Sequence, residues 1–435
     1  MLHDLTSYIY LLIYILLWAV TFYRNFRKVK FTTGTIIMLS YLIYGILSFF
    51  LYNDIYHGSD FKELTLLPFI YLFGMMYIFI KPVLKYEKKK VMFVRTPSDR
   101  IVRTFIVVYG ICALVTLPET IASLKEGLVL LLLESGGGRE LYLMAKENVT
   151  ARVAGVAGIY GLFAIIHNIF SNVALFIISY YLTVRNKNKY LLILLLVVII
   201  ADLLYPLSKG GRTDVIMKFF AIIMALSIFY PYYSQQLKKI IKKVFIVMSI
   251  IITIPFMAMT ISRFGEREGG TIGGMLSYIA QAPLNFNNNA LNNGGIRFGD
   301  RTINLFKQFA GLNPPASIND VRFKYSHHKM NDSIFSTYVG DFVLDYGPLA
   351  AVVIFILLSF IFFRIIRIRR KTISFQSLII IYFIACVAMQ GGMYLFYYSF
   401  QQNLQILAFM FIYVLFYIDS NNQKSGRYLI RNEYQ

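Results

Sequence analysis

The sequence predicts an all-α, polytopic transmembrane protein of about eleven membrane-spanning helices, and three observations indicate this fold class. Hydrophobic residues make up 57% of the 435-residue chain and the mean hydropathy is +0.61, which is more apolar surface than a soluble protein can hide. Uncharged apolar runs long enough to cross a bilayer recur along the chain. Charged residues gather in the links between these runs, so each run is expected to form one helix.

The expected spans follow the apolar runs in chain order, and each is bounded by charged or turn-forming residues. They cover roughly 5–23, 31–52, 65–80, 101–118, 153–184, 190–207, 215–233, 245–261, 341–363, 372–395 and 403–418. The opening MLHD lacks the cationic region of a signal peptide, so the first run is interpreted as a span. The stretch GLVLLLLE at 127–134 is too short to span and predicts an interfacial or re-entrant segment.

The links between spans alternate in charge. One set carries 26 Lys and Arg against four acids and comprises 24–30, 81–100, 185–189, 234–243, 364–371 and the C-terminal tail. The other set carries 15 Lys and Arg against a similar number of acids and comprises 53–64, 119–152, 207–214 and 262–340. By the positive-inside rule the first set is cytoplasmic, which places the N-terminus outside and the C-terminus inside. The net charge of +21 then reflects topology and contact with anionic membrane lipids, and nucleic acid is not an expected partner.

The chain is therefore expected to form a single integral membrane domain over residues 1–435. Its two longest external links are 119–152, with the interfacial segment, and the large loop 262–340. Cys112 and Cys386 both lie in apolar runs, which is typical of small core residues and implies no disulfide framework.

The shortest external link, SKGGRTD (208–214), packs two cations, two glycines and an acid between two spans. Its glycines allow a sharp turn with exposed backbone N–H groups, and the following helix directs its positive end at the same place. Lys209 and Arg212 add full charges, and an Arg fork suits a phosphate. An ordinary loop with cations at headgroup level is the alternative, but this is the face where cations are disfavoured.

The large external loop contains further candidates. Arg263, in ISRFGEREGG, lies at the end of a span, at the same expected depth as Arg212, which favours a second anion-binding group there. Tyr278 and Asn285, in GGMLSYIAQAPLNFNNNALNNGG, are candidates for stacking on sugar rings and for bonding sugar hydroxyls. A polar low-complexity loop is the alternative for this stretch.

Two histidines and two acids follow towards the end of this loop. His327 and His328 lie in a polar external segment, and histidine is the side chain best suited to proton transfer near neutral pH. Two exposed loop histidines are the alternative. Asp341 and Asp345 are four residues apart at the outer end of an expected span, so both carboxylates share one helical face. For these acids, structural roles are favoured over catalysis.

Polar residues inside the expected spans are further candidates, and several common motifs are missing. His167 and Asp202 are functional candidates by default, although Asp202 is near enough to the external face to pair with Lys209 or Arg212. The chain has no HExxH or CxxC spacing, no Walker-type loop and no Asp-x-Asp motif, so neither a metal nor a cofactor is expected. A reaction at such an external face needs a substrate already activated in the membrane, and a lipid-linked glycosyl diphosphate fits this description.

Three features resemble the oligosaccharide repeat-unit polymerases of O-antigen and capsule biosynthesis, the Wzy type. They are the turn SKGGRT (208–213) that opens a span, the element SRFG (262–265) that begins a large external loop, and the run NDSIFSTYVGDFVLDYG (331–347) into the next span. The resemblance covers roughly residues 190–350, and outside that range the chain is similar only in hydropathy.

The resemblance implies a metal-independent glycosyltransferase with a C-type membrane fold in the bacterial inner membrane. Such an enzyme moves a growing glycan from one undecaprenyl diphosphate to another lipid-linked repeat unit, and it allows for a chain-length regulator protein as a partner. Arg212 and Arg263 would hold diphosphates. The acceptor base would be His328, then His327, then Asp341. A phosphate-holding imidazolium is the other role open to the histidines.

Two other functions are compatible with these features. An O-antigen ligase uses the same chemistry with a different acceptor, lipid A core. A lipid-linked oligosaccharide flippase or transporter belongs to another class and should carry charged residues deep in its spans, whereas this sequence places most of its polar residues in external loops.

Overall fold

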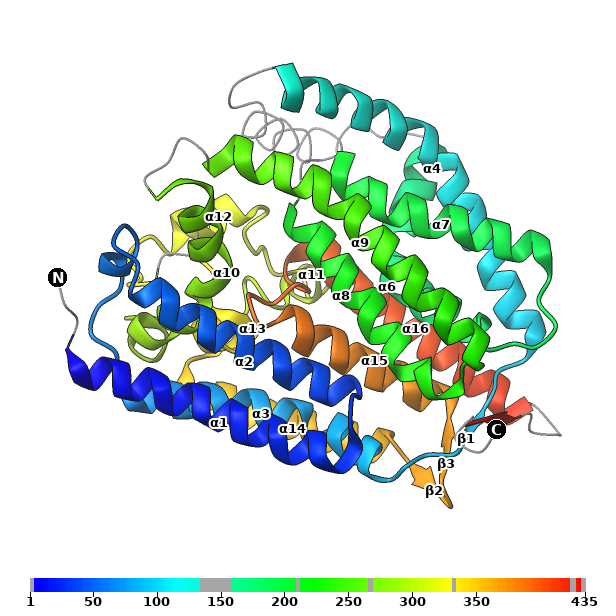
Figure 1. Ribbon diagram of the computed structural model, residues 1–435, viewed down its shortest axis with the longest axis horizontal. Helices are drawn as coiled ribbons and strands as arrows, with labels where there is room; N and C mark the ends of the chain where they lie inside the picture. The colour runs from blue at the N-terminus through cyan, green and yellow to red at the C-terminus, as the bar shows by residue number, and fades with distance from the viewer. Residues whose placement is uncertain are drawn as a thin grey trace. The chain divides into compact units, whose positions relative to one another are not determined.

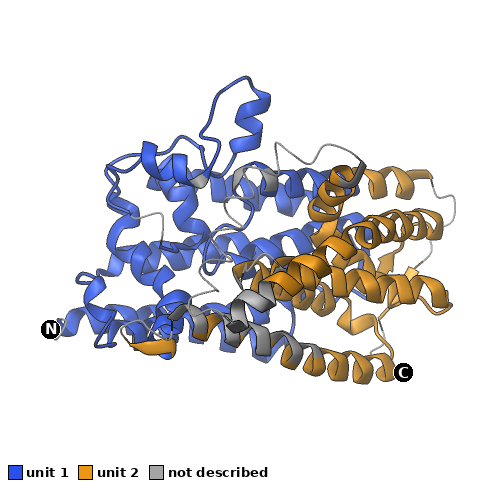
Figure 2. Ribbon diagram, turned by 90° about the horizontal axis from the view of Figure 1, so that it is seen from above, with its two compact units in different colours: residues 1–92, 272–413 blue, residues 93–271, 414–435 orange. Residues whose placement is uncertain are grey.

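In the computed structural model the chain is mostly helical (Figure 1). The structure describes residues 4–133, 159–208, 212–264, 269–330, 334–422 and 428–431. It contains two compact units (Figure 2). The first unit comprises residues 1–92 and 272–413, and the second comprises residues 93–271 and 414–435. The second unit is thus largely one continuous stretch inserted into the first, a division that hydropathy alone does not indicate.

Long apolar helices form the body of the first unit. They are α1 (Leu5–Val29), α2 (Thr33–Tyr52), α3 (Leu66–Lys88), α14 (Pro348–Ile365), α15 (Phe375–Gln390) and the first part of α16 (Ser399–Asn422). α1 packs against α2 and α3, and α3 also packs against α14 and α15. Trp18 is fully buried at this junction, with its ring centroid 4.7 Å from those of both Tyr41 and Phe73.

The second unit is a separate helical bundle. Its elements are β1 (Phe93–Arg95), α4 (Asp99–Leu133), α6 (Ile159–Tyr181), α7 (Lys189–Ser208), α8 (Arg212–Phe229), η2 (Tyr230–Tyr232), α9 (Gln235–Phe264) and β4 (Tyr428–Ile430). α4 packs against α6 and α7, α6 packs against α8, and β1 pairs with β4 in antiparallel register. Cys112 in this unit and Cys386 in the first are both free and buried, which confirms their assignment as core residues.

Among the described residues, nine helices are long and apolar enough to cross a membrane. They coincide with nine of the expected spans, which confirms a polytopic helical membrane protein. The other two expected spans are represented by α9, a helix of 30 residues that contains 245–261, and by α15, which has only 16 residues.

The span expected over 341–363 is in fact two helices. α13 (Thr337–Tyr346) ends at Gly347, which has a φ of 83°, and α14 begins directly at Pro348. A left-handed conformation suits glycine, and proline fits the first position of a helix. Asp341 and Asp345 therefore lie on a short separate helix, and both are fully buried rather than placed at the outer end of a span.

The two expected external loops also differ from the prediction. Residues 119–133 continue α4, a single helix of 35 residues, so the apolar stretch after Glu126 forms the end of that helix and the rest of the loop, 134–152, lies outside the described residues. The loop 262–340 contains α10 (Gly270–Asn289), η3 (Ala290–Asn292), α11 (Asn304–Phe309) and α12 (Ile318–Lys324). Its asparagine-rich part is thus a packed helix and not a low-complexity loop.

Long-range hydrogen bonds hold α10 against the link between α2 and α3. The Asn287 side chain accepts a hydrogen bond from the Thr65 N–H at 2.9 Å and donates to the Thr65 carbonyl at 2.7 Å. The Ser48 hydroxyl donates to the Ala280 carbonyl at 2.8 Å. At the start of α14, the Tyr71 hydroxyl donates to the Pro348 carbonyl at 2.6 Å. We call this side of the first unit the loop end, residues 53–65 and 273–347.

The opposite ends of the same helices carry basic links, residues 24–30, 81–92 and 364–374, which we call the basic end. Here the Lys85 ammonium lies 4.7 Å from the centroid of the Phe363 ring, and the Met92 N–H donates to the Lys371 carbonyl at 2.9 Å. α14, with 18 residues, is about 27 Å long at 1.5 Å per residue. The links that charge assigns to opposite faces of the membrane therefore lie at opposite ends of one bundle.

This arrangement predicts the result of a topology experiment. A reporter inserted after Gly311, in the exposed turn that follows α11, should read as external, and one inserted after Arg370 should read as cytoplasmic. The measurement is a pair of fusions that are active only in one compartment. Finding both reporters on one side would contradict the assignment of the two ends.

Candidate functional site

A buried ion-pair network organises the loop end. Arg297, which is 1% exposed, donates from Nε to the Asp345 carboxylate at 2.7 Å and from Nη2 to the Asp341 carbonyl at 3.2 Å. The other oxygen of Asp345 accepts the Thr302 N–H at 2.7 Å. Since buried charges persist only when paired and hydrogen-bonded, this network fixes the segment after η3 onto α13. Because Asp341 and Asp345 are four residues apart on one helical face, both carboxylates lie beside the Arg297 side chain.

The second acid of α13 is held in the same way. The Asp341 carboxylate lies 3.2 Å from Arg301 Nη1 and accepts the Leu395 N–H at 2.8 Å. The helix begins at Thr337, a β-branched residue with a φ of 69° that is held by a 2.7 Å hydrogen bond from its N–H to the Met393 carbonyl. Such a conformation costs about 1–3 kcal/mol, so its neighbours must enforce it. α13 is therefore a rigid support.

A second cluster surrounds Asp300, which is also buried. Its carboxylate accepts hydrogen bonds from Lys307, from Lys324 at 2.7 Å and from the Tyr325 hydroxyl at 2.7 Å. Burial pushes the pKa of Asp300 upwards, but the hydrogen bonds from Lys307, Lys324 and Tyr325 outweigh it and hold the pKa below its usual value. The bond to Asp300 in turn raises the pKa of Lys324. This cluster joins α11 and α12.

The lowered pKa of Asp300 predicts an acid-sensitive loop end. A carboxyl group whose folded pKa lies below its unfolded value stabilises the fold above about pH 4, and the contribution is lost as pH falls through the folded pKa. Asp300→Asn removes this contribution at every pH. We expect hydrogen exchange over 298–325 to differ between wild type and Asp300→Asn at neutral pH, and the difference to shrink below about pH 4. A difference that is independent of pH would contradict this assignment.

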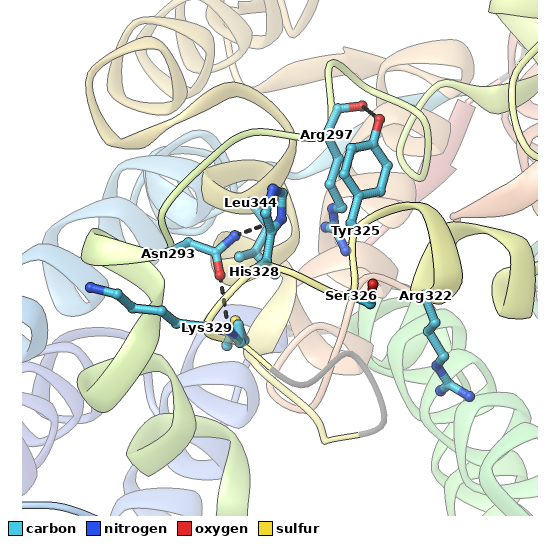
Figure 3. A pocket seen from close by; sticks show the side chains of 9 residues that line it. Asn293, Arg297, Arg322, Tyr325, Ser326, His328, Lys329 and Leu344 are labelled. Atoms are coloured by element: carbon cyan, nitrogen blue, oxygen red, sulfur yellow. Dashed lines mark hydrogen bonds between the residues drawn. The ribbon is translucent and has the colours of Figure 1, made fainter.

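Beside these clusters lies a cavity of about 300 Å³. Figure 3 shows the residues around it, which come from the segment after η3, from α12 and the turn that follows it, and from α13. They are Asn293, Arg297, Arg322, Tyr325, Ser326, His328, Lys329, Met330 and Leu344. Arg322 and Lys329 extend to opposite sides of the His328 ring (Figure 3). The described wall of the cavity thus combines one imidazole with cationic side chains and contains no carboxylate.

Hydrogen bonds to Asn293 determine which ring nitrogen of His328 carries the hydrogen. Asn293 Oδ1 accepts the Met330 N–H at 2.9 Å, so the amide NH₂ group is the one that faces His328. Asn293 Nδ2 lies 3.1 Å from His328 Nδ1 and can only donate to it. Nδ1 is therefore an acceptor, and we infer that the neutral ring carries its hydrogen on Nε2. In this tautomer Nε2 is a hydrogen-bond donor.

The backbone also fits closely around this ring. A Cβ atom added to Gly295 would lie 2.5 Å from His328 Nε2, which is closer than any real contact. The Tyr325 ring also packs against it, with its centroid 5.1 Å from that of His328. Packing and hydrogen bonding thus hold the imidazole in one orientation, as a binding or catalytic group requires.

The structure separates the three residues predicted as acceptor bases. His328 lines the cavity, whereas His327 is exposed, packs edge-on against His328 and is absent from the cavity wall. Asp341 is fully buried and engaged by Arg301 and the Leu395 N–H, so its carboxylate supports the fold and has no access to a substrate hydroxyl.

The predicted substrate-binding residues fall into two groups. Asn285 is buried, and its side chain donates to the Phe335 carbonyl at 3.1 Å and bonds Asn289, while Tyr278 packs edge-on against Phe335. Both therefore help to fix α10, and neither lines the cavity. Arg212 begins α8 and Arg263 is in the last turn of α9, but their side chains, like all of Lys209, lie outside the described residues.

Polar residues also lie within the helices of the second unit. His167 Nε2 is 3.4 Å from the Asp202 carboxylate, which also accepts the Tyr109 hydroxyl at 3.0 Å. Asp202 thus pairs within the bundle, where the sequence suggested Lys209 or Arg212. Lys218 on α8 is buried and hydrogen-bonds Ser171 and Asn172 of α6, a contact that the sequence did not indicate.

Sequence reasoning missed Arg297, Arg301, Asp300 and Asn293. One signal was available, because the pattern Arg-Phe-Gly-acid-Arg occurs twice, at 263–267 and at 297–301. The second copy supplies the two arginines that bind α13, together with Asp300 between them. No similar signal marks Asn293. Its role depends on hydrogen bonds to His328 and Met330, which lie 35 and 37 residues further along the chain. In the part of the chain that is described, no three His, Cys, Asp or Glu side chains gather so as to hold a metal ion.

Comparison of the chain with protein-family models, with curated proteins and with solved structures finds no match.

Proposed function

We propose that the protein polymerises undecaprenyl diphosphate-linked oligosaccharide repeat units on the external face of the bacterial inner membrane. The product would be an O-antigen or capsular polysaccharide. The motifs SKGGRT, SRFG and NDSIFSTYVGDFVLDYG, which resemble those of repeat-unit polymerases, favour this reaction. The nine apolar helices among the described residues fit an enzyme whose substrates are held in a membrane.

The cavity at the loop end is the observation that carries the proposal. It lies at the end of the bundle opposite the basic links, where a lipid-linked diphosphate would present its headgroup and sugars. Its wall offers Arg322, Lys329 and the His328 imidazole, which suit an anionic group, together with the Asn293 and Ser326 side chains for sugar hydroxyls. The ion-pair networks around Arg297 and Asp300 hold this wall in place.

The reaction is a glycosyl transfer between two lipid-linked substrates. A hydroxyl oxygen of the acceptor sugar forms a bond to the anomeric carbon of the donor glycan, and the bond from that carbon to the diphosphate breaks. The diphosphate leaves with the electron pair, and the hydroxyl proton passes to a base. A donor such as His328 Nε2–H stabilises negative charge on an oxygen atom. The sequence left open a base and a phosphate-holding imidazolium for this histidine. The hydrogen bond that Nδ1 accepts from Asn293 instead favours a neutral ring that donates from Nε2 to an anionic oxygen.

An assay with the purified protein tests the proposal. In vesicles that contain only lipid-linked repeat units, a polymerase should produce a ladder of glycans of increasing length. A ligase should act only when lipid A core is added, and a transporter should move the substrates across the bilayer without lengthening them. Absence of a ladder with active, correctly inserted protein would refute the polymerase function.

The motif SKGGRT (208–213) leads to a prediction about Arg212. If its guanidinium binds a diphosphate through two hydrogen bonds, Lys cannot replace it, because an ammonium is a point charge. Contacts to a developing leaving group contribute about 3 kcal/mol or more, so Arg212→Ala and Arg212→Lys should both lose roughly a hundredfold in rate. The readout is the glycan ladder, with membrane insertion as the control. Normal chain length in both variants would exclude Arg212 from the reaction.

A flippase remains the second candidate function because three ionisable side chains are buried in helices of the second unit. His167, Asp202 and Lys218 belong to the type of intramembrane residue that commonly marks a transport path. Asp202→Asn and Lys218→Met should abolish translocation of lipid-linked oligosaccharides if the protein is a flippase. They should leave polymer length unchanged if these residues only join helices.

A further inference from the structure

A second cavity, of about 270 Å³, lies at the basic end of the first unit. It is formed where α3 and α14 end side by side, and by the residues that lead into the hairpin of β2 (Ile368–Arg369) and β3 (Thr372–Ser374). Its cationic side chains are Lys85, Lys89, Arg367 and Arg369, and its apolar wall is formed by Pro82, Tyr86, Phe363, Ile366 and Ile368. This cavity is therefore separated from the loop-end cavity by the length of α14.

The cationic side chains of this cavity are not matched by acids. Within the described ranges, no carboxylate forms an ion pair with Lys85, Lys89, Arg367 or Arg369. The Lys85 ammonium instead lies over the Phe363 ring, and Arg367 Nε donates to the Arg364 carbonyl at 3.3 Å. Like charges around one small space repel each other, so a bound anion would stabilise the arrangement.

The backbone next to the cavity is held in an unusual conformation. Arg370 and Lys371, which connect β2 to β3, have φ values of 46° and 61°. This left-handed conformation is unfavourable for residues other than glycine. The hydrogen bond from the Met92 N–H to the Lys371 carbonyl fixes this turn against the segment after α3. Strained backbone that its neighbours hold in place is common at ligand sites. The hairpin thus adds support to a preformed cationic site.

The chemistry of the walls identifies the class of ligand. Two Arg forks and two Lys ammonium groups suit the several acceptor oxygens of a phosphate. In the turns of α14 that precede the lining residue Phe363, exposed apolar side chains offer a surface along which an acyl chain can lie, namely Val353, Ile356, Leu357, Phe360 and Ile361. Basic pockets at the cytoplasmic ends of transmembrane helices are suited to phospholipid headgroups.

We propose that this cavity binds the phosphate headgroup of an anionic phospholipid from the cytoplasmic leaflet. The lipid would occupy the groove between the ends of α3 and α14, with its phosphate among the four cations. This site is independent of the reaction proposed for the loop end, since it lies at the other end of the bundle.

Two matched sets of substitutions test the proposal on the full chain. The cavity set changes Lys85, Lys89, Arg367 and Arg369 to Gln. The control set changes Arg24, Arg27, Lys28 and Lys30 to Gln, and so removes the same number of Lys and Arg, all of them also exposed, from the same end of the same unit. The protein in detergent is titrated with phosphatidylglycerol, with phosphatidylcholine or with inorganic phosphate, and its thermal unfolding midpoint is followed. A third variant, with Arg367→Lys and Arg369→Lys, keeps the charge.

We expect phosphatidylglycerol to raise the midpoint of the wild type and of the control set in a saturable way, and phosphatidylcholine to have no such effect. In the cavity set the half-saturating concentration of phosphatidylglycerol should rise at least about tenfold. The Arg→Lys variant should give an intermediate value, because a Lys ammonium lacks the two parallel donors of a guanidinium. Equal loss in the cavity and control sets would overturn the proposal in favour of diffuse surface attraction. A cavity set that responds like wild type would overturn it directly, and an equal response to inorganic phosphate would replace the lipid by a soluble phosphate ligand.

Discussion

Replacing Asn293 by Asp should reduce polymerisation about as strongly as removing His328 itself. The new carboxylate would still accept the Met330 N–H, but its second oxygen would face His328 Nδ1 as an acceptor. The imidazole would then place its hydrogen on Nδ1 and present a lone pair at Nε2. If His328 stabilises an anionic oxygen by donating from Nε2, both Asn293→Asp and His328→Ala should lose roughly a hundredfold or more in rate. The measurement is the rate of glycan lengthening with lipid-linked repeat units.

The same pair of residues separates the two possible roles of the histidine. A general base needs the Nε2 lone pair, so Asn293→Asp would preserve or increase the activity of a base while it inactivates a donor. His328→Gln completes the comparison, because a glutamine amide can donate but cannot accept a proton at neutral pH. Partial activity in His328→Gln with none in Asn293→Asp supports the donor. The reverse pattern would restore the base that the sequence suggested. His327→Ala serves as the matched control and should be close to wild type.

A steric substitution examines the same ring without changing its chemistry. Gly295→Ala places a methyl carbon 2.5 Å from the present position of His328 Nε2, so we expect the ring to shift and its hydrogen bond to Asn293 to weaken. Gly294→Ala is not a suitable control, because Gly294 has a φ of 84° and alanine would strain the backbone. Gly74→Ala, on α3, is a better comparison, because a Cβ atom added to Gly74 meets no atom within 4 Å. Loss of activity in Gly295→Ala alone would show that the position of the ring matters.

Hydropathy predicted the long helices well because each of them satisfies its own backbone and hides its length in lipid. It could not separate α13 from α14, since YVGDFVLDY and the span after Pro348 are both apolar and the break depends on two residues, Gly347 and Pro348. It also missed α10, whose Asn285 and Asn287 side chains are buried because they bond the backbone at Phe335 and Thr65. Composition suggested a solvated loop, but the partners of these amides are distant in sequence.

The sequence predicted only part of the candidate site, because some of the contacts that define the site join residues far apart in the chain. The sequence singled out His328 by its residue type and its place in an external segment, and left open a base and a phosphate-holding imidazolium. In the fold the Lys324 ammonium pairs with Asp300, and Asn293 determines the tautomer of the ring. Local sequence thus indicated which side chain is central, but its protonation pattern depends on residues that only the fold brings together.

Breaking the Arg297–Asp345 pair should destabilise the loop end more than any other single change considered for it. Both side chains are at most 1% exposed, so removing one leaves the other charge buried and poorly compensated. Such losses are typically about 3–5 kcal/mol. We expect Arg297→Met and Asp345→Leu to lower the free energy of local opening over 296–346 by this amount, as measured by hydrogen exchange. Asp320→Ala, which removes an exposed helix-capping carboxylate, is the matched control and should cost about 1 kcal/mol.

The double variant Arg297→Met with Asp345→Leu gives the sharper test of this pair. Replacing both charges with apolar groups of similar size removes the uncompensated partner, so the double variant should be more stable than either single one. The Thr302 N–H would still lose the Asp345 carboxylate as acceptor, so recovery should be incomplete by about 1–3 kcal/mol. If the two single losses simply add, the residues do not act as a pair. In that case the position of α13, and with it the Leu344 wall of the cavity, must be set by Asp341 and the strained start of the helix at Thr337.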